Sequence, residues 1–219
     1  DTQIKFDLFF IFVFYNIMKR SLDLFCGTKS FSKVAERYGY ETTTLDILQE
    51  FLPTHCCDIL DWDYKQYPVG HFDIIWASPN CKDYSKMNFL SGKDKDLTES
   101  NNLIKKTIEI IKYFNPEYWF LENPATGKLV YQEFMDFIPF TDIDYCKYGF
   151  DIRKRTRIWN NLLWDAQPPC CKGHYCKNKE RDKVHTEMNW ITRGGGSSKW
   201  EKRIMVPSKL FEEILNNIN

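Results

Sequence analysis

The sequence of 219 residues carries 30 lysines and arginines against 30 aspartates and glutamates, with 43% hydrophobic and 16% aromatic residues. This composition excludes a disordered chain, and the balanced charge excludes binding to nucleic acid through net charge alone, so such binding would need local basic patches. The length favours a single domain and excludes a second large recognition domain. Eight cysteines without a recognisable secretion signal favour reduced thiols in an intracellular protein.

Residues 1–17 are expected to be extraneous to the domain or to add an edge segment to it. The apolar run from Leu8 to Tyr15 is about half as long as the roughly 20 residues that cross a bilayer. It also lacks the cationic opening and the small-residue cleavage site of a signal peptide. We therefore expect no membrane association, and we expect the main domain to start at Met18.

A strand, a turn and a helix are predicted at the start of this domain. Ser21 to Phe25 is a short apolar run, and 26–29 forms the turn. Residues 30–38 have the apolar spacing of a helix, which stops at Gly39. This order predicts a first strand–helix unit.

Acidic residues follow the next two predicted strands. Thr42 to Leu45 leads into Asp46, about 20 residues after the turn at Gly27, which is the spacing at which nucleotide-binding folds place an acid on ribose hydroxyls. The run from His55 to Cys57 leads into Asp58. The sequence therefore predicts a cofactor site across the tips of the first strands.

The central strand is predicted at Phe72 to Ala77, and it delivers a cysteine. The run is too short for a helix, and Pro79 cannot continue a ladder inside a sheet. A free cysteine usually only packs in a core. Cys81, however, lies just past Pro79 and beside Lys82, a cation that would favour the thiolate. We interpret Cys81 as a candidate nucleophile, with a loop thiol as the alternative.

The remaining elements continue the alternation of strands and helices. An amphipathic helix is predicted at Leu97 to Phe114, a strand at Tyr118 to Leu121, a helix around Leu129 to Phe137 and a strand near Thr141 to Cys146. Alternation of this kind implies an α/β fold with a mostly parallel, doubly wound sheet that helices cover on both faces.

Charged residues at two further places invite a chemical role. Glu122 directly follows a predicted strand, where burial favours the protonated acid that can donate a hydrogen bond. The alternative is a strand-end acid that reaches water. Arg153, Arg155 and Arg157 alternate, so in an extended chain they point to one side and suit phosphate or base oxygens. The alternative is a solvated basic edge strand.

Residues 164–200 are predicted to be rich in loops, and 201–219 to form a C-terminal helix that packs back on the core. Cysteines and histidines in the loop region are interpreted either as zinc ligands or as exposed reduced thiols, because their spacing is not the usual repeated pair of a zinc site. The candidate ligands are Cys170, Cys171, His174 and Cys176, with His185 nearby.

Four segments, in order, resemble motifs of the DNA (cytosine-5)-methyltransferase family, most closely its compact phage-like and large-virus-like members. Residues Leu22-Asp-Leu-Phe-Cys-Gly-Thr28 are similar to the cofactor motif Asp-Leu-Phe-x-Gly-x-Gly-Gly, and Ser78-Pro-Asn-Cys-Lys-Asp-Tyr-Ser85 is similar to the Pro-Pro-Cys loop. Glu122-Asn-Pro124 resembles Glu-Asn-Val. Tyr148-Gly149 with Arg153-x-Arg155-x-Arg157 resembles Tyr-Gly followed by Gln-x-Arg-x-Arg.

The resemblance implies a reaction. The Cys81 thiolate attacks carbon 6 of a cytosine flipped out of DNA, Glu122 hydrogen-bonds ring nitrogen 3, and carbon 5 takes the methyl group of S-adenosylmethionine. By the same resemblance, Arg155 and Arg157 hold the base and the Cys81 loop, and Asn123 orients that loop.

The resemblance also implies a Rossmann-like methyltransferase core at 18–163, a reduced recognition region at 164–200 and two sets of binding residues. The cofactor is expected at Asp23, Phe25, Cys26, Gly27, Asp46, Ile47, Asp58, Ile59 and Pro79, with Asp46 on the ribose and Asp58 on the adenine amino group. Nucleic acid is expected at Ser85, Asn123, Arg153, Arg155 and Arg157.

Several positions depart from the family pattern. Lys29 and Ser30 stand where two glycines are usual, Asn80 replaces the second proline, and Arg153 stands where glutamine is usual. These departures bear on cofactor affinity and rate more than on the type of reaction.

Two other function classes stay open. Ser78 to Cys81 lies where N4-cytosine and N6-adenine methyltransferases carry their Pro-Pro-aromatic motif, although Cys81, Glu122 and the arginines argue against that class. A nucleic-acid binder that keeps the fold with weak catalysis is the second, and an RNA substrate is as compatible with the residues as DNA. A compact viral member would act in the cytoplasm or nucleus, in a viral factory or a phage-infected cell.

Overall fold

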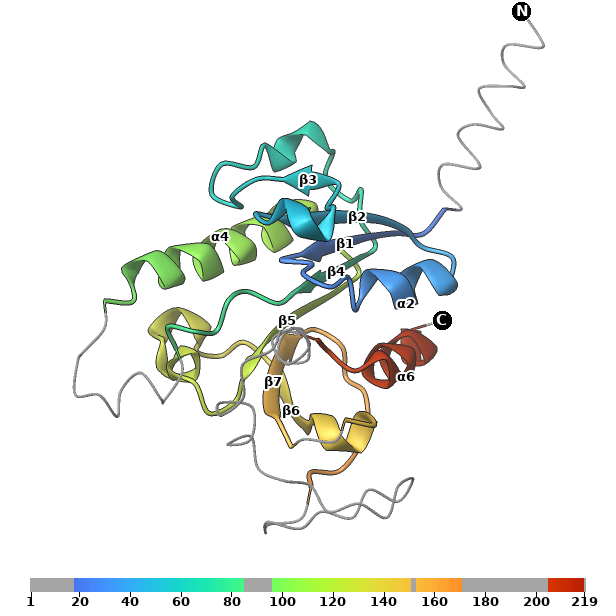
Figure 1. Cartoon of the computed structure of the whole chain (residues 1–219), viewed down its shortest axis with the longest axis vertical. Helices are drawn as coiled ribbons and strands as arrows, with labels where there is room; N and C mark the ends of the chain where they lie inside the picture. Colours follow the sequence, from blue (N-terminus) through green and yellow to red (C-terminus); the bar gives the residue numbers. More distant parts are fainter. Residues whose placement is uncertain (1–17, 85–95, 151–152, 171–204, 219) are drawn as a thin grey trace, which may run out of the picture.

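The computed structural model describes residues 18–84, 96–150, 153–170 and 205–218. Strands and helices alternate through most of this part of the chain (Figure 1). The strands are β1 (Arg20–Leu24), β2 (Glu41–Asp46), β3 (His55–Cys56), β4 (Ile74–Ala77), β5 (Tyr118–Pro124), β6 (Phe140–Asp144) and β7 (Arg155–Asn160). The α-helices are α2 (Ser32–Arg37), α4 (Thr98–Phe114) and α6 (Ser208–Ile218), and the short 3₁₀ helices are η1 (Gln49–Phe51), η2 (Tyr64–Gln66), η3 (Lys128–Tyr131), η4 (Glu133–Met135) and η5 (Tyr145–Tyr148).

The strands form one seven-stranded sheet in the order β3-β2-β1-β4-β5-β7-β6. Strands β1 to β5 run parallel, and β7 runs antiparallel to both of its neighbours, β5 and β6. The predicted α/β fold with a mostly parallel, doubly wound sheet is therefore confirmed. The strand order reverses between β1 and β4, and open α/β sheets bind ligands in the crevice at the carboxyl ends of such strands.

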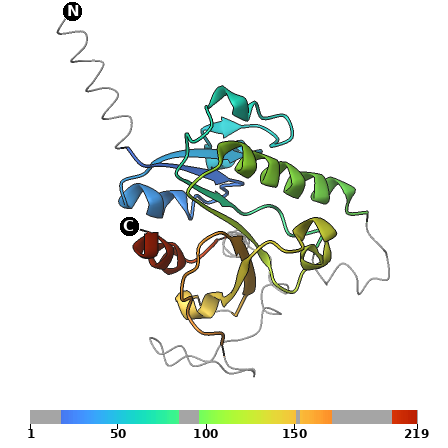
Figure 2. The same ribbon diagram turned by 180° about the vertical axis from the view of Figure 1, so that it is seen from behind.

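Helices α2 and α6 cover one face of the sheet, and α4 covers the other (Figures 1 and 2). Because side chains alternate along a strand, β4 sends Trp76 to the first face, where the centroid of its ring lies 4.7 Å from that of Phe211 in α6. Ile75 and Ala77 turn to the second face and pack in the same cluster as Phe114 of α4. Among the described residues, no helix is both long and apolar enough to span a membrane.

The two longest predicted helices are confirmed. α4 buries Ile104, Ile110 and Ile111 and ends at Asn115, whose left-handed backbone (φ 48°) stops the helix. α6 follows Pro207 and buries its apolar side chains against α2, with an ion pair of 3.0 Å between Arg37 and Glu212 at the edge of this contact. The C-terminal helix thus packs back on the sheet as expected.

The α-helix predicted at residues 129–137 is wrong. The 3₁₀ helices η3 and η4 take its place, and Gln132, which has an extended backbone, separates them. The side chain of Gln132 accepts a 3.0 Å hydrogen bond from the amide of Asn101 in α4, and Leu129 and Met135 fill the core on this face. These tertiary contacts override local helix propensity.

The basic segment at residues 153–157 enters the sheet instead of flanking it. β7 pairs with β5 on one side and with β6 on the other, so the alternative of a solvated edge strand is wrong. The edge strand is β6. It ends at Asp144, and the chain then tightens into η5, so the strand predicted at 141–146 is two residues shorter at its carboxyl end.

A buried carboxylate ties β1 to the start of α2. Asp23 is 2% exposed, and it accepts a 2.5 Å hydrogen bond from the Ser32 hydroxyl and a 3.3 Å bond from the Ser32 backbone N–H. Burial is the largest influence on this group and raises the pKa of Asp23 to about 7 despite these bonds. The hydrogen bonds between Asp23 and Ser32 thus fix the turn between β1 and α2.

This pKa makes the free energy of unfolding depend on pH. An aspartate in an unfolded chain has a pKa of about 3.9, so the folded protein holds a proton on Asp23 that the unfolded chain has lost. The resulting stabilisation is complete below about pH 4 and is lost as the pH rises through about 7. Asp23→Asn should flatten the decline in the free energy of unfolding over this range, measured by urea denaturation. Equal slopes for the two proteins would contradict the assignment.

Candidate active site

The tips of β1 and β2 are joined by Asp46. One of its carboxylate oxygens accepts a 2.9 Å hydrogen bond from the backbone N–H of Gly27, and the other accepts a 2.9 Å bond from Leu48. The turn after β1 needs left-handed backbone at Gly27 (φ 46°) and also at Phe25 and Lys29 (φ 59° and 57°). Asp46 therefore organises the turn that the sequence assigned to the cofactor.

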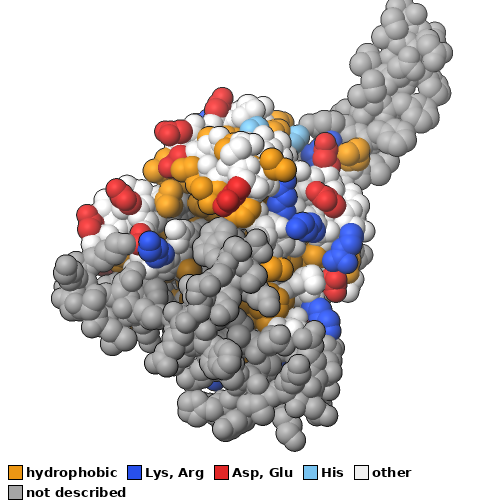
Figure 3. Space-filling view, in the orientation of Figure 1, with side chains coloured by type: hydrophobic (Ala, Val, Ile, Leu, Met, Phe, Trp, Pro, Cys, Tyr) orange, Lys and Arg blue, Asp and Glu red, His pale blue; other side chains and the backbone are white. Residues whose placement is uncertain are grey.

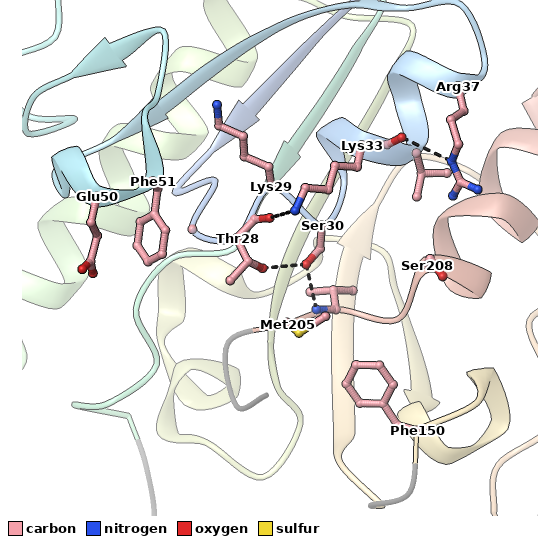
Figure 4. Close-up of a pocket in the computed structure, with 13 residues that line it drawn as sticks. Thr28, Lys29, Ser30, Lys33, Arg37, Glu50, Phe51, Phe150, Met205 and Ser208 are labelled. Atoms are coloured by element: carbon pink, nitrogen blue, oxygen red, sulfur yellow. Dashed lines mark hydrogen bonds between the residues drawn. The ribbon is translucent and has the colours of Figure 1, made fainter. Parts of the chain in front are cut away.

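A cavity of about 830 Å³ lies beside this turn (Figure 4). Gly27, which belongs to the predicted cofactor set, is one of the residues that line it. Lys33 and Arg37 of α2 lie on one side, and Glu50 and Phe51 of η1 lie on the opposite side. Phe150 and Met205 contribute from the carboxyl-terminal half of the chain. The sequence analysis missed Glu50 and Phe51, because a single turn of 3₁₀ helix has no periodic signature.

The other predicted cofactor residues differ in their exposure. Asp58 follows β3 and caps a turn by accepting a 2.9 Å bond from the backbone N–H of Leu60, while Ile59 is buried and Ile47 is 62% exposed. Cys26 is buried, and burial raises the pKa of its thiol to about 12, so its sulfur packs as a neutral group. Whether each contacts the cofactor stays a prediction.

The loop that carries Cys81 is held from the neighbouring strand. The side-chain amide of Asn123, at the end of β5, donates a 3.2 Å hydrogen bond to the carbonyl of Pro79. Asn123 is fully buried. It orients the Cys81 loop, as the resemblance implied, but its burial leaves it no surface for the direct nucleic-acid contact that was also predicted.

The Cys81 thiol lies beside two charged groups. Burial raises the pKa of Cys81, the positive charge of Lys154 opposes this rise, and the negative charge of Glu122 adds to it. The sequence assigned this effect to Lys82; the structure shows it for Lys154, and an effect of Lys82 stays a prediction. The thiol of the free protein is therefore neutral at neutral pH, and attack requires a change in its surroundings.

Glu122 is 5% exposed and accepts two hydrogen bonds at one carboxylate oxygen. The Tyr145 hydroxyl donates a bond of 2.9 Å, and the Lys154 ammonium donates one of 3.2 Å. The sequence predicted a protonated donor at this position. In the structure Glu122 is an acceptor within an ion pair, so it can donate to a ligand only after a proton arrives.

The arginines of β7 lie on the opposite face of the sheet from Glu122. Glu122 pairs with Ile158, and the next residue of β5 pairs with Arg157, so alternation turns Arg157 away from Glu122. Arg157 binds Asp142 through two hydrogen bonds of 2.8 and 2.9 Å. The contact of Arg155 and Arg157 with a base stays a prediction.

Arg155 and Arg153 share one partner. Arg155 binds Asp144 through two hydrogen bonds of 3.2 and 2.9 Å, and Arg153 reaches the same carboxylate at 3.4 Å. Arg155 and Arg157 do point to one side, as the alternation predicted. That side faces acidic residues of β6.

Several predicted residues lie outside the described part of the chain, namely Ser85, Cys171, His174 and Cys176. Cys170 is buried, is disulfide-bonded in this structure, and donates its backbone N–H to Asp144. Its sulfur is therefore not a thiolate ligand here, which corrects the zinc interpretation for this residue. The described residues contain no group of three or more His, Cys, Asp or Glu side chains arranged to hold a metal ion.

Comparison with known proteins gives two close matches in sequence. The family model of the C-5 cytosine-specific DNA methylases matches residues 19–126. The probable DNA (cytosine-5)-methyltransferase of Frog virus 3 (isolate Goorha) is 32% identical over 216 residues, which cover 90% of this chain and 99% of that protein.

Solved structures resemble the chain more distantly. The methyltransferase EhMeth of Entamoeba histolytica is 16% identical, with a TM-score of 0.47, over 83% of this chain and 62% of that one. The Dnmt2 methyltransferase of S. pombe is 11% identical, with a TM-score of 0.44, over 81% and 56% of the two chains. This chain thus spans less than two thirds of either solved protein.

The mostly parallel seven-stranded sheet, with its strand order reversed between β1 and β4, is an α/β fold. The family model and the viral relative identify a methyltransferase within this fold class. The chain belongs to the C-5 cytosine-specific DNA methylase family.

Asp46→Ala should weaken the binding of S-adenosylmethionine by at least about tenfold. The carboxylate accepts two backbone N–H groups that shape the turn, and hydrogen bonds to charged groups contribute about 1.5–3 kcal/mol each. Calorimetry measures the affinity. Asp63→Ala, which removes an exposed carboxylate beside η2, is the matched control and should leave it unchanged. Unchanged affinity in a folded Asp46→Ala protein would mean that the cofactor binds elsewhere.

Proposed function

We propose that this chain transfers the methyl group of S-adenosylmethionine to carbon 5 of cytosine in DNA through a covalent bond from Cys81. One observation carries the proposal. A thiol just past β4 and a buried carboxylate near the end of the adjacent strand β5, Cys81 and Glu122, come close enough that the charge of Glu122 raises the pKa of the thiol. Family membership supports the reaction and the DNA substrate.

The residues suit each bond change of this reaction. The Cys81 sulfur forms a bond to carbon 6 of the pyrimidine, while Glu122 as an acid hydrogen-bonds ring nitrogen 3 and takes up the charge that develops there. Carbon 5 becomes nucleophilic and forms a bond to the transferred methyl carbon, whose bond to the sulfonium sulfur of the cofactor breaks and leaves its electron pair on that sulfur. A base then removes the proton from carbon 5, and the bond between sulfur and carbon 6 breaks, which restores the thiolate.

The cavity beside the β1 turn fits the cofactor. Its volume of about 830 Å³ is within the range of small-molecule sites, about 300–1,000 Å³. Glu50 offers a carboxylate to ribose hydroxyls, Phe51 offers a ring to the adenine, and Lys33 lies at the other side with the turn (Figure 4). When bound, S-adenosylmethionine supplies an electrophilic methyl group.

The position of Lys29 bears on the departure from the family pattern. Lys29 keeps the left-handed backbone that a glycine would adopt without strain (φ 57°), and its ammonium donates a 2.6 Å bond to the carbonyl of Leu52. This bond links the turn after β1 to the segment after η1. We infer that it compensates part of the strain and keeps the cofactor turn in its family-like shape.

Membership of the viral relative in the same family supports a place of action inside an infected cell, in the cytoplasm or the nucleus.

The alternative of amino-group methylation is less compatible with the residues, because direct transfer to an exocyclic nitrogen uses no thiol nucleophile. Neither amino-group methylation nor the other alternative, a nucleic-acid binder with weak catalysis, gives a role to the pair of Cys81 and Glu122.

DNA that contains 5-fluorocytosine tests the covalent step. Fluorine cannot leave carbon 5 as a proton does, so after methyl transfer the enzyme should stay bound to the DNA as an adduct that resists denaturation. Cys81→Ser should abolish both the adduct and methyl transfer, because a hydroxyl is a far poorer nucleophile than a thiolate. Gel electrophoresis detects the adduct, and mass spectrometry locates the methyl group.

The matched control is Cys56→Ser, since Cys56 is an exposed free thiol and should be dispensable. Wild-type rates of carbon-5 methylation by a Cys81→Ser protein would end the nucleophile assignment. A methyl group on an exocyclic nitrogen would move the protein to the amino-methyltransferase class, and activity on RNA alone would change the substrate.

A further inference from the structure

A single lysine, Lys154, forms an ion pair with Glu122 and also acts through its charge on Cys81. Lys154 immediately precedes β7, and its position in the alternation puts it on the side of Thr156 and Ile158, away from the arginines. Its ammonium lies 3.2 Å from Glu122, and the two side chains are 13% and 7% exposed. A surface lysine that binds DNA phosphates would be far more exposed, so Lys154 is built into the site.

Tyr145 holds this lysine in place. The Lys154 ammonium lies 4.7 Å from the centroid of the Tyr145 ring, a geometry in which ring and cation attract. The Tyr145 hydroxyl donates to the same Glu122 oxygen that Lys154 contacts. Burial, followed by the charge of Glu122, raises the pKa of Tyr145, so its hydroxyl stays a donor. Lys154, Tyr145 and Glu122 therefore form one connected group.

The arginines cannot supply the charge that Lys154 supplies. Arg155 and Arg157 lie on the other face of the sheet, and each is bound by two hydrogen bonds to an aspartate of β6. Cys81, in contrast, responds to the charges of both Lys154 and Glu122. Within the described part of the chain, Lys154 is the cation that this geometry joins to the two predicted catalytic groups.

We propose that Lys154 is a positioning residue that serves Cys81 and Glu122 in turn. In the free protein its ammonium holds the Glu122 carboxylate, and during the reaction it balances the charge of the Cys81 thiolate once Glu122 is protonated beside the base. The inference rests on the proposed function for the second of these states only. The action of Lys154 on the thiol can be measured without DNA.

The test is the rate at which iodoacetamide alkylates Cys81, followed by peptide mass spectrometry at one pH near neutrality. Exposed Cys56 of the same molecule is the internal reference. Lys154→Met, which keeps the length of the side chain without its charge, should lower the ratio of the Cys81 rate to the Cys56 rate about tenfold, the effect of one unit in pKa on the thiolate fraction. Lys154→Arg should restore most of the ratio.

Glu122→Gln should change the ratio of the Cys81 to the Cys56 alkylation rate in the opposite direction. It removes the negative charge that opposes the thiolate and leaves Lys154 beside Cys81, so the alkylation ratio should rise. A purely structural role of Lys154 would move neither ratio in a charge-dependent way. An unchanged ratio in folded Lys154→Met, or equal ratios for the methionine and arginine variants, would overturn the proposal. If Lys154→Met unfolds, judged by its urea midpoint, Lys154→Gln replaces it.

The adduct with 5-fluorocytosine DNA separates this inference from the proposed function. If the wild-type protein forms the adduct, Lys154→Met should form it at least about tenfold more slowly, with unchanged affinity for S-adenosylmethionine because the cofactor cavity does not include Lys154. If the wild-type protein forms no adduct while the alkylation ratios change as expected, the proposed function fails and the action of Lys154 on Cys81 stands.

Discussion

The antiparallel register between β5 and β7 is the constraint on which the site depends. It pairs Glu122 with Ile158 and Asn123 with Arg157, so Glu122 faces α2 and α6 while the arginines face the side of α4. A slip of one residue would exchange the two faces. In this register the last residues of β5 divide their roles, because Glu122 meets the thiol and Asn123 holds the loop that carries it.

On its other side β7 pairs with β6, and two ion pairs between facing residues fix the register of these two strands. Asp144 is fully buried, and although burial alone would raise the pKa of Asp144, hydrogen bonds from Arg155 and from the Cys170 backbone hold it below its usual value. A slipped strand would leave this carboxylate buried without its partner, which costs several kcal/mol. Arg157 is bound to Asp142 in the same way, and its guanidinium lies 3.5 Å from the centroid of the Phe140 ring. In the free protein, Arg155 and Arg157 therefore hold β6 and β7 together.

Local sequence signals predicted well which residues lie near the ends of strands, but they did not predict which face of the sheet each side chain occupies. Proline after an apolar run located Cys81 just past β4, and an acid at the end of a short apolar run located Asp46 at the end of β2, because those signals lie within a few residues of each site. Glu122 was expected just past its strand, but β5 continues to Pro124, so Glu122 lies within the strand. The face that each β7 side chain occupies depends on its pairing with two strands distant in sequence, so it was not predictable from residues 153–157 alone. Lys154 was not singled out from the sequence. Tyr145 had no local signal, since it lies in a 3₁₀ turn.

The charge balance among Cys81, Glu122 and Lys154 explains why a single lysine can serve both states. In the free protein, Cys81 is a neutral thiol and Glu122 is the acceptor of two hydrogen bonds, so one negative charge faces Lys154. Attack on a cytosine needs a thiolate together with a protonated acid, because ring nitrogen 3 is an acceptor and cannot bond to a second acceptor. That state again holds one negative charge. The Lys154 ammonium compensates this negative charge in both states, so neither state leaves a buried charge unpaired.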